Sequence, residues 1–325
     1  MDLSAAVTTG IYSDITDKSV AMAAYYGSNT VDFDFGYAGE KAGFSAEIEC
    51  DFDASSEDKT ALRLNPFNAW VKGFDGKLTV TGGYLYATNS WASPIYSTGL
   101  AYYDYGVQVA VSPVSGLTLG ALYSIDNTEL SYADQEAADV AKTLLSGLNV
   151  GARYKVGFAT IIGGYGWFYG TTDNAWLGAT IVPASVVRVQ ADLGCSNVFG
   201  INSDVRTVKA AERVFVYPID GLAIQERVRY QINTSTKKQS INEYLKVSYD
   251  VTDYVTPFVN AACVTKDLSD FAGTTVWMVQ PGADWTICDN LSVSTYYTYS
   301  TSPLSYGYYA LNKGSSVNVS ASWSF

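Results

Sequence analysis

The chain has 325 residues, a net charge of −12 and no histidine. The acidic balance leaves no basic stripe to neutralise phosphate groups, which excludes binding to nucleic acid. No apolar run approaches the ~18 residues that a membrane-spanning helix needs, so a helical membrane protein is excluded. The 26 tyrosines and 7 tryptophans suit either a secreted soluble β-protein or a barrel with aromatic girdles at the membrane interfaces.

Segments in which apolar and polar residues alternate recur along the chain, as strands with one apolar face require. The first half has them at 3–12, 20–27, 31–37, 44–52, 69–74, 78–86, 100–112 and 117–125. The second half has them at 148–154, 160–169, 176–182, 186–193, 206–217, 222–233, 244–249, 256–264, 276–285, 291–299 and 317–325. These are about nineteen strands, whereas a single-chain transmembrane barrel should have an even number.

We therefore predict an all-β fold, a transmembrane antiparallel β-barrel of about sixteen to eighteen strands that forms one domain over residues 1–325. Eighteen strands is the preferred number, with the surplus strand near the amino terminus or around 182–184. The fold should also contain a short helical loop, described below.

The connecting segments alternate in length. Gly, Pro and Asp mark short turns at 74–77, 113–116, 218–221 and 250–253. Longer links lie between them, at 53–66, 87–98, 126–146, 234–242, 265–273 and 300–315. Transmembrane barrels have short turns on one rim and long loops on the other, whereas a soluble β-sandwich shows no such rule. The long loops should face the outside of the cell.

One long link, residues 131–148, has a helical pattern. Ser131 can cap the amino end, and Gly147 supplies the stop. Two positions of this helix stay open. It lies over the barrel mouth, or it folds inward and narrows the channel with Tyr132, Leu144 and Leu145.

Two neighbouring strands carry acidic residues on the face opposite their apolar one, and a later group of strands carries basic residues there. Because a charged side chain in lipid is expensive, we expect these residues to line the pore. The acidic set is Asp32, Asp34, Glu47, Glu49 and Asp51, and the basic set is Arg153, Lys155, Arg188, Lys209, Arg213, Arg227 and Arg229. About half a circumference separates the acids from the main basic group. They form either a designed transverse field or ordinary solvated charges of the lumen.

Glu212 and Glu226 depart from this pattern because they fall on the apolar face of their strands. Two acids exposed to lipid would be costly. Either a β-bulge resets the register there, or the patch meets another subunit.

The last strand carries a further signal. Val319, Ala321, Trp323 and Phe325 alternate with small polar residues, and the chain stops on an aromatic side chain. This ending resembles the closing strand of bacterial outer-membrane β-barrels of the porin type, where it is the assembly signal. The segments 68–72 and 117–123 look like those of spirochaete-type major outer-membrane barrels. The resemblance implies the bacterial outer membrane with its lipid as the location, the barrel-assembly machinery as a partner, and a homotrimer.

The resulting functional prediction is a porin that lets small hydrophilic solutes and ions diffuse passively. Acidic loops beside a nearly balanced lumen predict mild cation selectivity. Without histidine, Ser-His-Asp and Cys-His chemistry and imidazole metal sites are unavailable, so we expect no enzyme, no cofactor and no metal. Two alternatives remain: a structural or adhesive surface protein anchored by its barrel, and a channel specific for sugars, whose rings aromatic tracks can guide.

Overall fold

A computed structural model of the protein describes residues 2–16, 18–21, 29–52, 60–84, 105–125, 147–168, 173–199, 205–302, 304–306, 309–311 and 313–324. Among these residues, no helix is long and apolar enough to cross a membrane.

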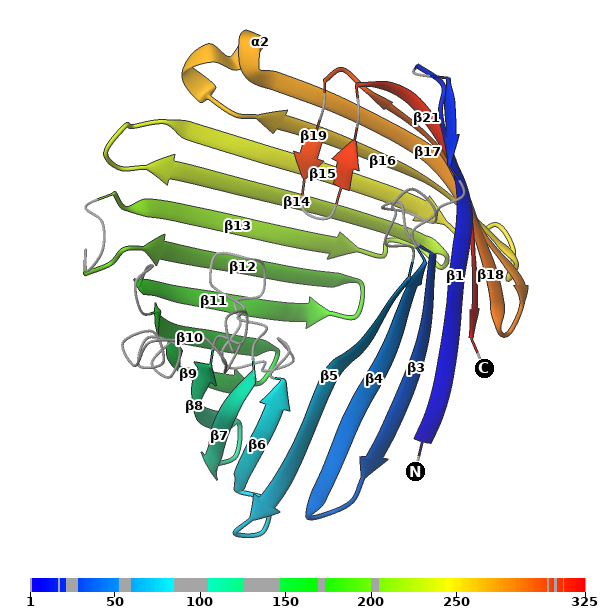
Figure 1. Ribbon diagram of the computed structural model, residues 1–325. Helices are drawn as coiled ribbons and strands as arrows, with labels where there is room; N and C mark the ends of the chain where they lie inside the picture. Colours follow the sequence, from blue (N-terminus) through cyan, green and yellow to red (C-terminus); the bar gives the residue numbers. More distant parts are fainter. Residues whose placement is uncertain are drawn as a thin grey trace, which may run out of the picture.

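Eighteen antiparallel strands close into one barrel, which confirms the predicted fold and the preferred strand number. Each strand pairs with the next along the chain, and β1 pairs with β21 to close the ring. These first and last strands lie side by side, blue and red, in Figure 1. The wall consists of β1 (Asp2–Asp14), β3 (Asn29–Ala38), β4 (Ala42–Phe52), β5 (Thr60–Gly73), β6 (Leu78–Tyr84), β7 (Tyr105–Val114), β8 (Leu117–Ile125), β9 (Gly147–Val156), β10 (Ala159–Phe168), β11 (Asp173–Ala184), β12 (Val187–Ser196), β13 (Thr207–Val216), β14 (Leu222–Asn233), β15 (Gln239–Tyr249), β16 (Val255–Thr265), β17 (Thr275–Cys288), β18 (Leu291–Ser300) and β21 (Gly314–Ser324).

Among the described residues, three short strands lie outside this ring. The predicted strand 20–27 is not part of the ring and is the surplus one of the nineteen. Its described part belongs to β2 (Ser19–Ala21), which pairs with the end of β1. Residues 22–28 lie outside the described part. β19 (Leu304–Tyr306) and β20 (Tyr309–Leu311) form a separate hairpin.

The helical residues that the structure describes lie in the link between β16 and β17, as a 3-10 turn η1 (Leu268–Asp270) and a short helix α2 (Phe271–Thr274). The predicted helix at 131–148 lies outside the described residues up to 146. Gly147, the predicted stop of that helix, is the first residue of β9, so the strand begins where the helix was expected to end.

The alternation of short turns and long links follows the prediction. All four predicted short turns join strands at one rim, and every predicted long link joins strands at the other. Two strands begin inside predicted links, β5 at Thr60 in the link 53–66 and β15 at Gln239 in the link 234–242, so these boundaries are wrong. Ser45 of β4 pairs with Asn68 of β5 and Glu47 with Asn65, so β5 contains one extra residue at this register shift. The extra residue breaks the period-two pattern of β5, and the first half of this strand was therefore not recognised in the sequence.

The two faces of the wall have opposite character. On β7, Val107 and Val109 are 49% and 37% exposed, while Gln108 between them is 6% exposed. On β17, Trp277 and Val279 are 54% and 46% exposed, while Gln280 is 3% exposed. Apolar side chains therefore cover the outer face and polar ones turn to the inside, the reverse of a soluble β-protein.

Candidate functional site

The inside of β3 and β4 carries the acidic wall, defined as Asp32, Asp34, Glu47 and Glu49. Asp32 is the direct partner of Glu49, and Asp34 of Glu47, while the apolar Val31, Phe33 and Phe35 take the outward positions. Asp51 occupies the next alternate position of β4, opposite Thr30.

The carboxylates of the acidic wall lie close together. Carboxylate oxygens of Asp32, Glu47 and Glu49 lie within 4.8 Å of one another, near enough to attract a cation jointly. Two hydroxyl groups approach the wall at long hydrogen-bond distances: Ser4 Oγ lies 3.4 Å from Asp34 Oδ2, and Thr30 Oγ1 lies 3.3 Å from Asp32 Oδ2. Repeated carboxylates on neighbouring strands make a negatively charged, partly solvated surface.

The inside of β12, β13 and β14 carries the basic wall, defined as Arg188, Lys209, Arg213, Arg227 and Arg229. Arg213 and Arg227 are direct partners across β13 and β14. Arg188 stands opposite Phe215, and Arg229 opposite Ala211. One inward acid was not predicted: Asp192 on β12 is 5% exposed and is the direct partner of Ala211.

Aromatic rings support the cations of this side of the barrel. The guanidinium carbon of Arg188 lies 3.9 Å from the centroid of Phe215, and that of Arg213 lies 5.7 Å from it. Arg227 lies 5.0 Å from the ring of Tyr244 on β15. The Nε atoms of Arg188, Arg213 and Arg229 are buried. The basic wall is therefore packed, and cation–π contacts orient its charges.

The two walls stand on opposite sides of the barrel. In the ring of eighteen strands, β12 lies nine strands from β3, and β13 lies nine strands from β4. Half a circumference therefore separates the acidic carboxylates from the main group of guanidinium groups.

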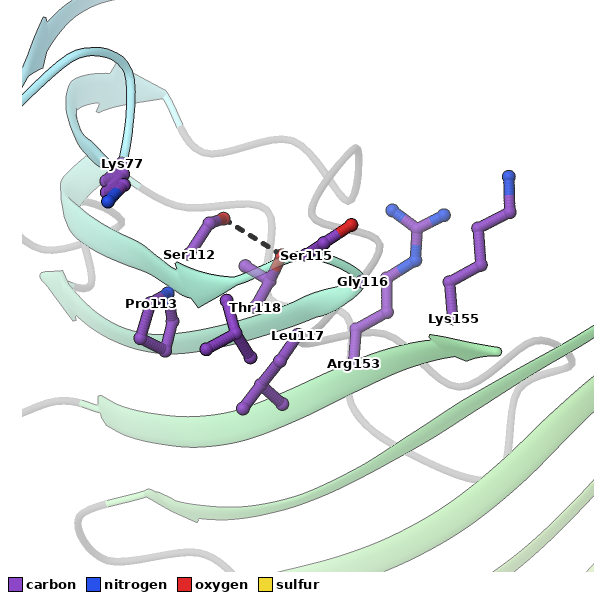
Figure 2. Close-up of a pocket in the computed structure, with 10 residues that line it drawn as sticks. Lys77, Ser112, Pro113, Ser115, Gly116, Leu117, Thr118, Arg153 and Lys155 are labelled. Carbon is purple, nitrogen blue, oxygen red and sulfur yellow. Dashed lines mark hydrogen bonds between the residues drawn. The ribbon is translucent and has the colours of Figure 1, made fainter. Parts of the chain in front are cut away.

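Arg153 and Lys155, the remaining predicted basic residues, lie apart from the basic wall, on the inward face of β9 near the short-turn rim. They border a hollow of about 410 Å³ with Lys77 and the turn between β7 and β8. Figure 2 shows Lys77 on one side of this hollow and both β9 cations on the other, with Ser112 and Ser115 between them. Ser112 Oγ and Thr118 Oγ1 share a hydrogen bond of 3.3 Å there. The hollow is a cationic edge of the short-turn rim of the barrel.

The outer face of the middle of β13, β14 and β15 carries carboxylates. Glu212 is the direct partner of the outward Val228, Glu226 that of Val214, and both are exposed. The pairing of β13 with β12 and with β14 runs without a register shift, so the β-bulge explanation is wrong. The two acids are diagonal neighbours across the pair of strands.

The structure adds a third outward acid, Glu243, opposite Val228 on β15. The sequence missed it because the predicted strand began at Tyr244, whereas β15 begins at Gln239. Away from strand ends, these three are the only Asp, Glu, Lys or Arg residues at outward positions in the described wall strands. We call them the outward acid patch.

The closing strand β21 pairs with β18 on one side and β1 on the other. Val319 and Trp323 face outward at 42% and 52% exposure, and Ala321 shares their face. Phe325, like Tyr132, Leu144 and Leu145 of the predicted constriction, lies outside the described residues.

No family model and no curated protein matches the sequence. Solved structures match it over nearly its whole length. The outer membrane protein OpdK from Pseudomonas aeruginosa has a TM-score of 0.65 at 10% identity, over 99% of this chain and 98% of that one. The present chain therefore has the same fold as OpdK. OpdK with vanillate gives a TM-score of 0.66, 10% identity and coverages of 99% and 98%. OccAB3 from Acinetobacter baumannii gives 0.62, 9% identity and coverages of 99% and 98%.

These likenesses confirm the predicted porin-type outer-membrane barrel as the fold. The narrower similarity to spirochaete-type barrels stays a prediction.

Proposed function

We propose that the protein is a passive diffusion channel of the bacterial outer membrane for small hydrophilic solutes and ions. The reversed distribution of polarity carries this proposal: an exposed apolar skin suits lipid, and buried polar and charged side chains suit an enclosed column of water. A barrel of this strand number is too wide for side chains to fill, so an aqueous path remains. The channel works as one domain and without catalysis.

The two walls give this channel its proposed selectivity. Acid on one side and base on the other create a transverse field, which orients dipolar solutes and disfavours lipophilic ones. We propose that both walls, with Arg153 and Lys155, line the solute path. Guanidinium groups bind carboxylates in a bidentate way, so small carboxylate-bearing solutes can follow the basic wall. The presence of vanillate with OpdK, which has the same fold, supports this class of solute. Among simple salts, the acidic loops give mild cation selectivity.

Conductance tests the channel directly. Purified protein in planar lipid bilayers should show steady channels, and added neutral polymers should reduce the current until they become too large to enter. Insertion that stays tight to ions would contradict the proposal and favour an anchor for surface loops. Reversal potentials in a potassium chloride gradient that favour anions would contradict the cation selectivity.

We also propose that the barrel-assembly machinery recognises β21 and that the protein forms a homotrimer through the outward acid patch. Carboxylates in the middle of lipid-facing strands are unfavourable, and water held between subunits would relieve that cost. Replacing Glu212, Glu226 and Glu243 together by Leu should convert the trimer to monomers in native electrophoresis. If the patch faces lipid instead, the same variant stays monomeric and becomes more stable to urea.

A further inference from the structure

The inside of β15, β16, β17, β18 and β21 holds a small hollow that neither charged wall explains. Its volume is about 220 Å³, room for about seven water molecules. It lies below the ~300 Å³ at which pockets for drug-sized ligands begin, so it suits one small ring or group. All its lining residues occupy inward positions: Lys246, Phe258, Asn260, Gln280, Asp284, Ser294, Tyr296 and Ser320.

A chain of amides forms one side of this hollow. Asn260 Nδ2 donates to Gln280 Oε1 at 2.7 Å, and Gln280 Nε2 donates to Thr298 Oγ1 at 2.9 Å. Asn260 is 5% exposed, yet its Oδ1 has no hydrogen-bond partner in the structure. A buried acceptor without a partner is costly, and a ligand hydroxyl in the hollow would satisfy it once the amide turns toward the hollow.

Two rings form a further part of the lining. Gly282 is the direct partner of both Phe258 and Tyr296. A Cβ at Gly282 would lie 2.5 Å from Phe258 Cζ and 2.7 Å from Tyr296 Cβ, so the missing side chain makes room for the rings. Aromatic faces of this kind pack against the C–H face of a sugar.

The charges of the lining balance each other. Lys246 Nζ lies over the Phe258 ring at 5.0 Å, and Asp284 Oδ1 accepts from Ser294 Oγ at 2.7 Å. The two residues come from different strands, and Asn260 and Gln280 stand in the same cross-strand row as Lys246, away from Asp284. A lining with one cation, one anion, amides and hydroxyls favours a neutral solute with many hydroxyl groups.

We propose that this hollow is a binding subsite for one neutral sugar ring on the channel wall. The proposal rests on the channel function given above and names a class of solute for it. Asn260 Oδ1 accepts from a sugar hydroxyl, Asp284 accepts from another, and Tyr296 packs against the ring.

Glucose is the probe, and Asn260→Ala is the main variant. In planar bilayers, glucose should interrupt the wild-type current in a concentration-dependent way. The apparent affinity should fall about tenfold in Asn260→Ala, the loss of one buried hydrogen bond to ligand. Asn149→Ala is the matched control, because Asn149 is an inward amide on β9, 3% exposed, whose Oδ1 also lacks a partner. It should leave the glucose effect unchanged.

Two further measurements keep the result decisive. Ser320→Leu fills the hollow and leaves Asn260 and Gln280 themselves unchanged, so it should abolish the effect even if Asn260→Ala fails to fold. Saturation-transfer NMR on detergent-solubilised protein reports glucose contact whether or not the barrel conducts. If the protein passes no current but contacts glucose, and Asn260→Ala removes that contact, the channel function is overturned and the subsite is supported. A conducting channel with equal glucose effects in wild type, Asn260→Ala and Ser320→Leu, or with none, would overturn the subsite alone.

Discussion

The acidic and the basic wall have similar sequence patterns and different physical surroundings. On β3 and β4 the carboxylates gather within 4.8 Å of one another, and the hydroxyl contacts of Asp32 and Asp34 are long. On β12 to β14 three of the five cations, Arg188, Arg213 and Arg227, lie over rings, and three of the Nε atoms are buried. The alternation of charged and apolar residues therefore indicates which face of the strand a residue occupies. The packing around a charged group determines how fixed its orientation is. The acidic wall should respond to salt, and the basic wall should resist it.

Reversal of charge in the basic wall should have the largest effect. Arg213→Glu with Arg227→Glu places two negative charges at a position where two cations face each other. We expect the preference for cations to rise about fivefold or more, since a pair of charges in water interacts by about 1 kcal/mol. Reversal potentials in a potassium chloride gradient measure it. Arg213→Lys with Arg227→Lys is the control, and selectivity equal to wild type in the reversed variant would remove the basic wall from the solute path.

Neutralising the acidic wall should have a smaller effect of the opposite sign. Asp32→Asn, Glu47→Gln and Glu49→Gln together should reduce the cation preference by about twofold to threefold, because solvent screens these carboxylates. The difference from wild type should shrink as the salt concentration rises from 0.1 to 1 M, where the Debye length falls from about 10 to about 3 Å. A difference that salt leaves constant would show that the acidic wall is as shielded from water as the basic one.

Removing one ring tests whether packing holds the basic wall. Phe215→Leu deletes the ring beneath Arg188 and Arg213 and should lower the stability to urea in lipid vesicles by about 1 kcal/mol. Phe215→Tyr keeps a ring and should retain the wild-type value. Conductance noise should increase in the Leu variant alone, because its guanidinium groups lose a fixed orientation.

The hydroxyl contacts of the acidic wall should matter least. Ser4→Ala and Thr30→Val remove hydrogen bonds of 3.4 and 3.3 Å, which are too long to be strong. We expect selectivity and stability to stay within error of wild type. A shift in reversal potential comparable with that of the neutralised acidic wall would mean that protein contacts, and not water, hold these carboxylates.

Where the alternation is unbroken, the sequence assigned several charges to the inward face, although it missed Asp192 on β12. Asp32, Glu49, Arg213 and Arg229 all occupy the face opposite exposed apolar residues. It failed where a strand is irregular or where its start was placed too late. The register shift beside Glu47 concealed the start of β5, and the late start assigned to β15 concealed Glu243. Lys246 was also missed, although it alternates with Leu245 and Val247 and its signal was present.

By itself, the sequence determined the class of fold, a range of sixteen to eighteen wall strands with eighteen preferred, the rim to which each turn belongs and the face that most charges occupy. These properties follow from local periods and turn residues, because side chains in a strand must alternate and tight turns need particular residues. Only the tertiary structure decided which side chains from different strands meet. The three acids of the outward acid patch, the ring beneath Arg188 and the hollow beside Asn260 all depend on the register between strands. That register is set by the joint closure of all eighteen strands, which no single segment encodes.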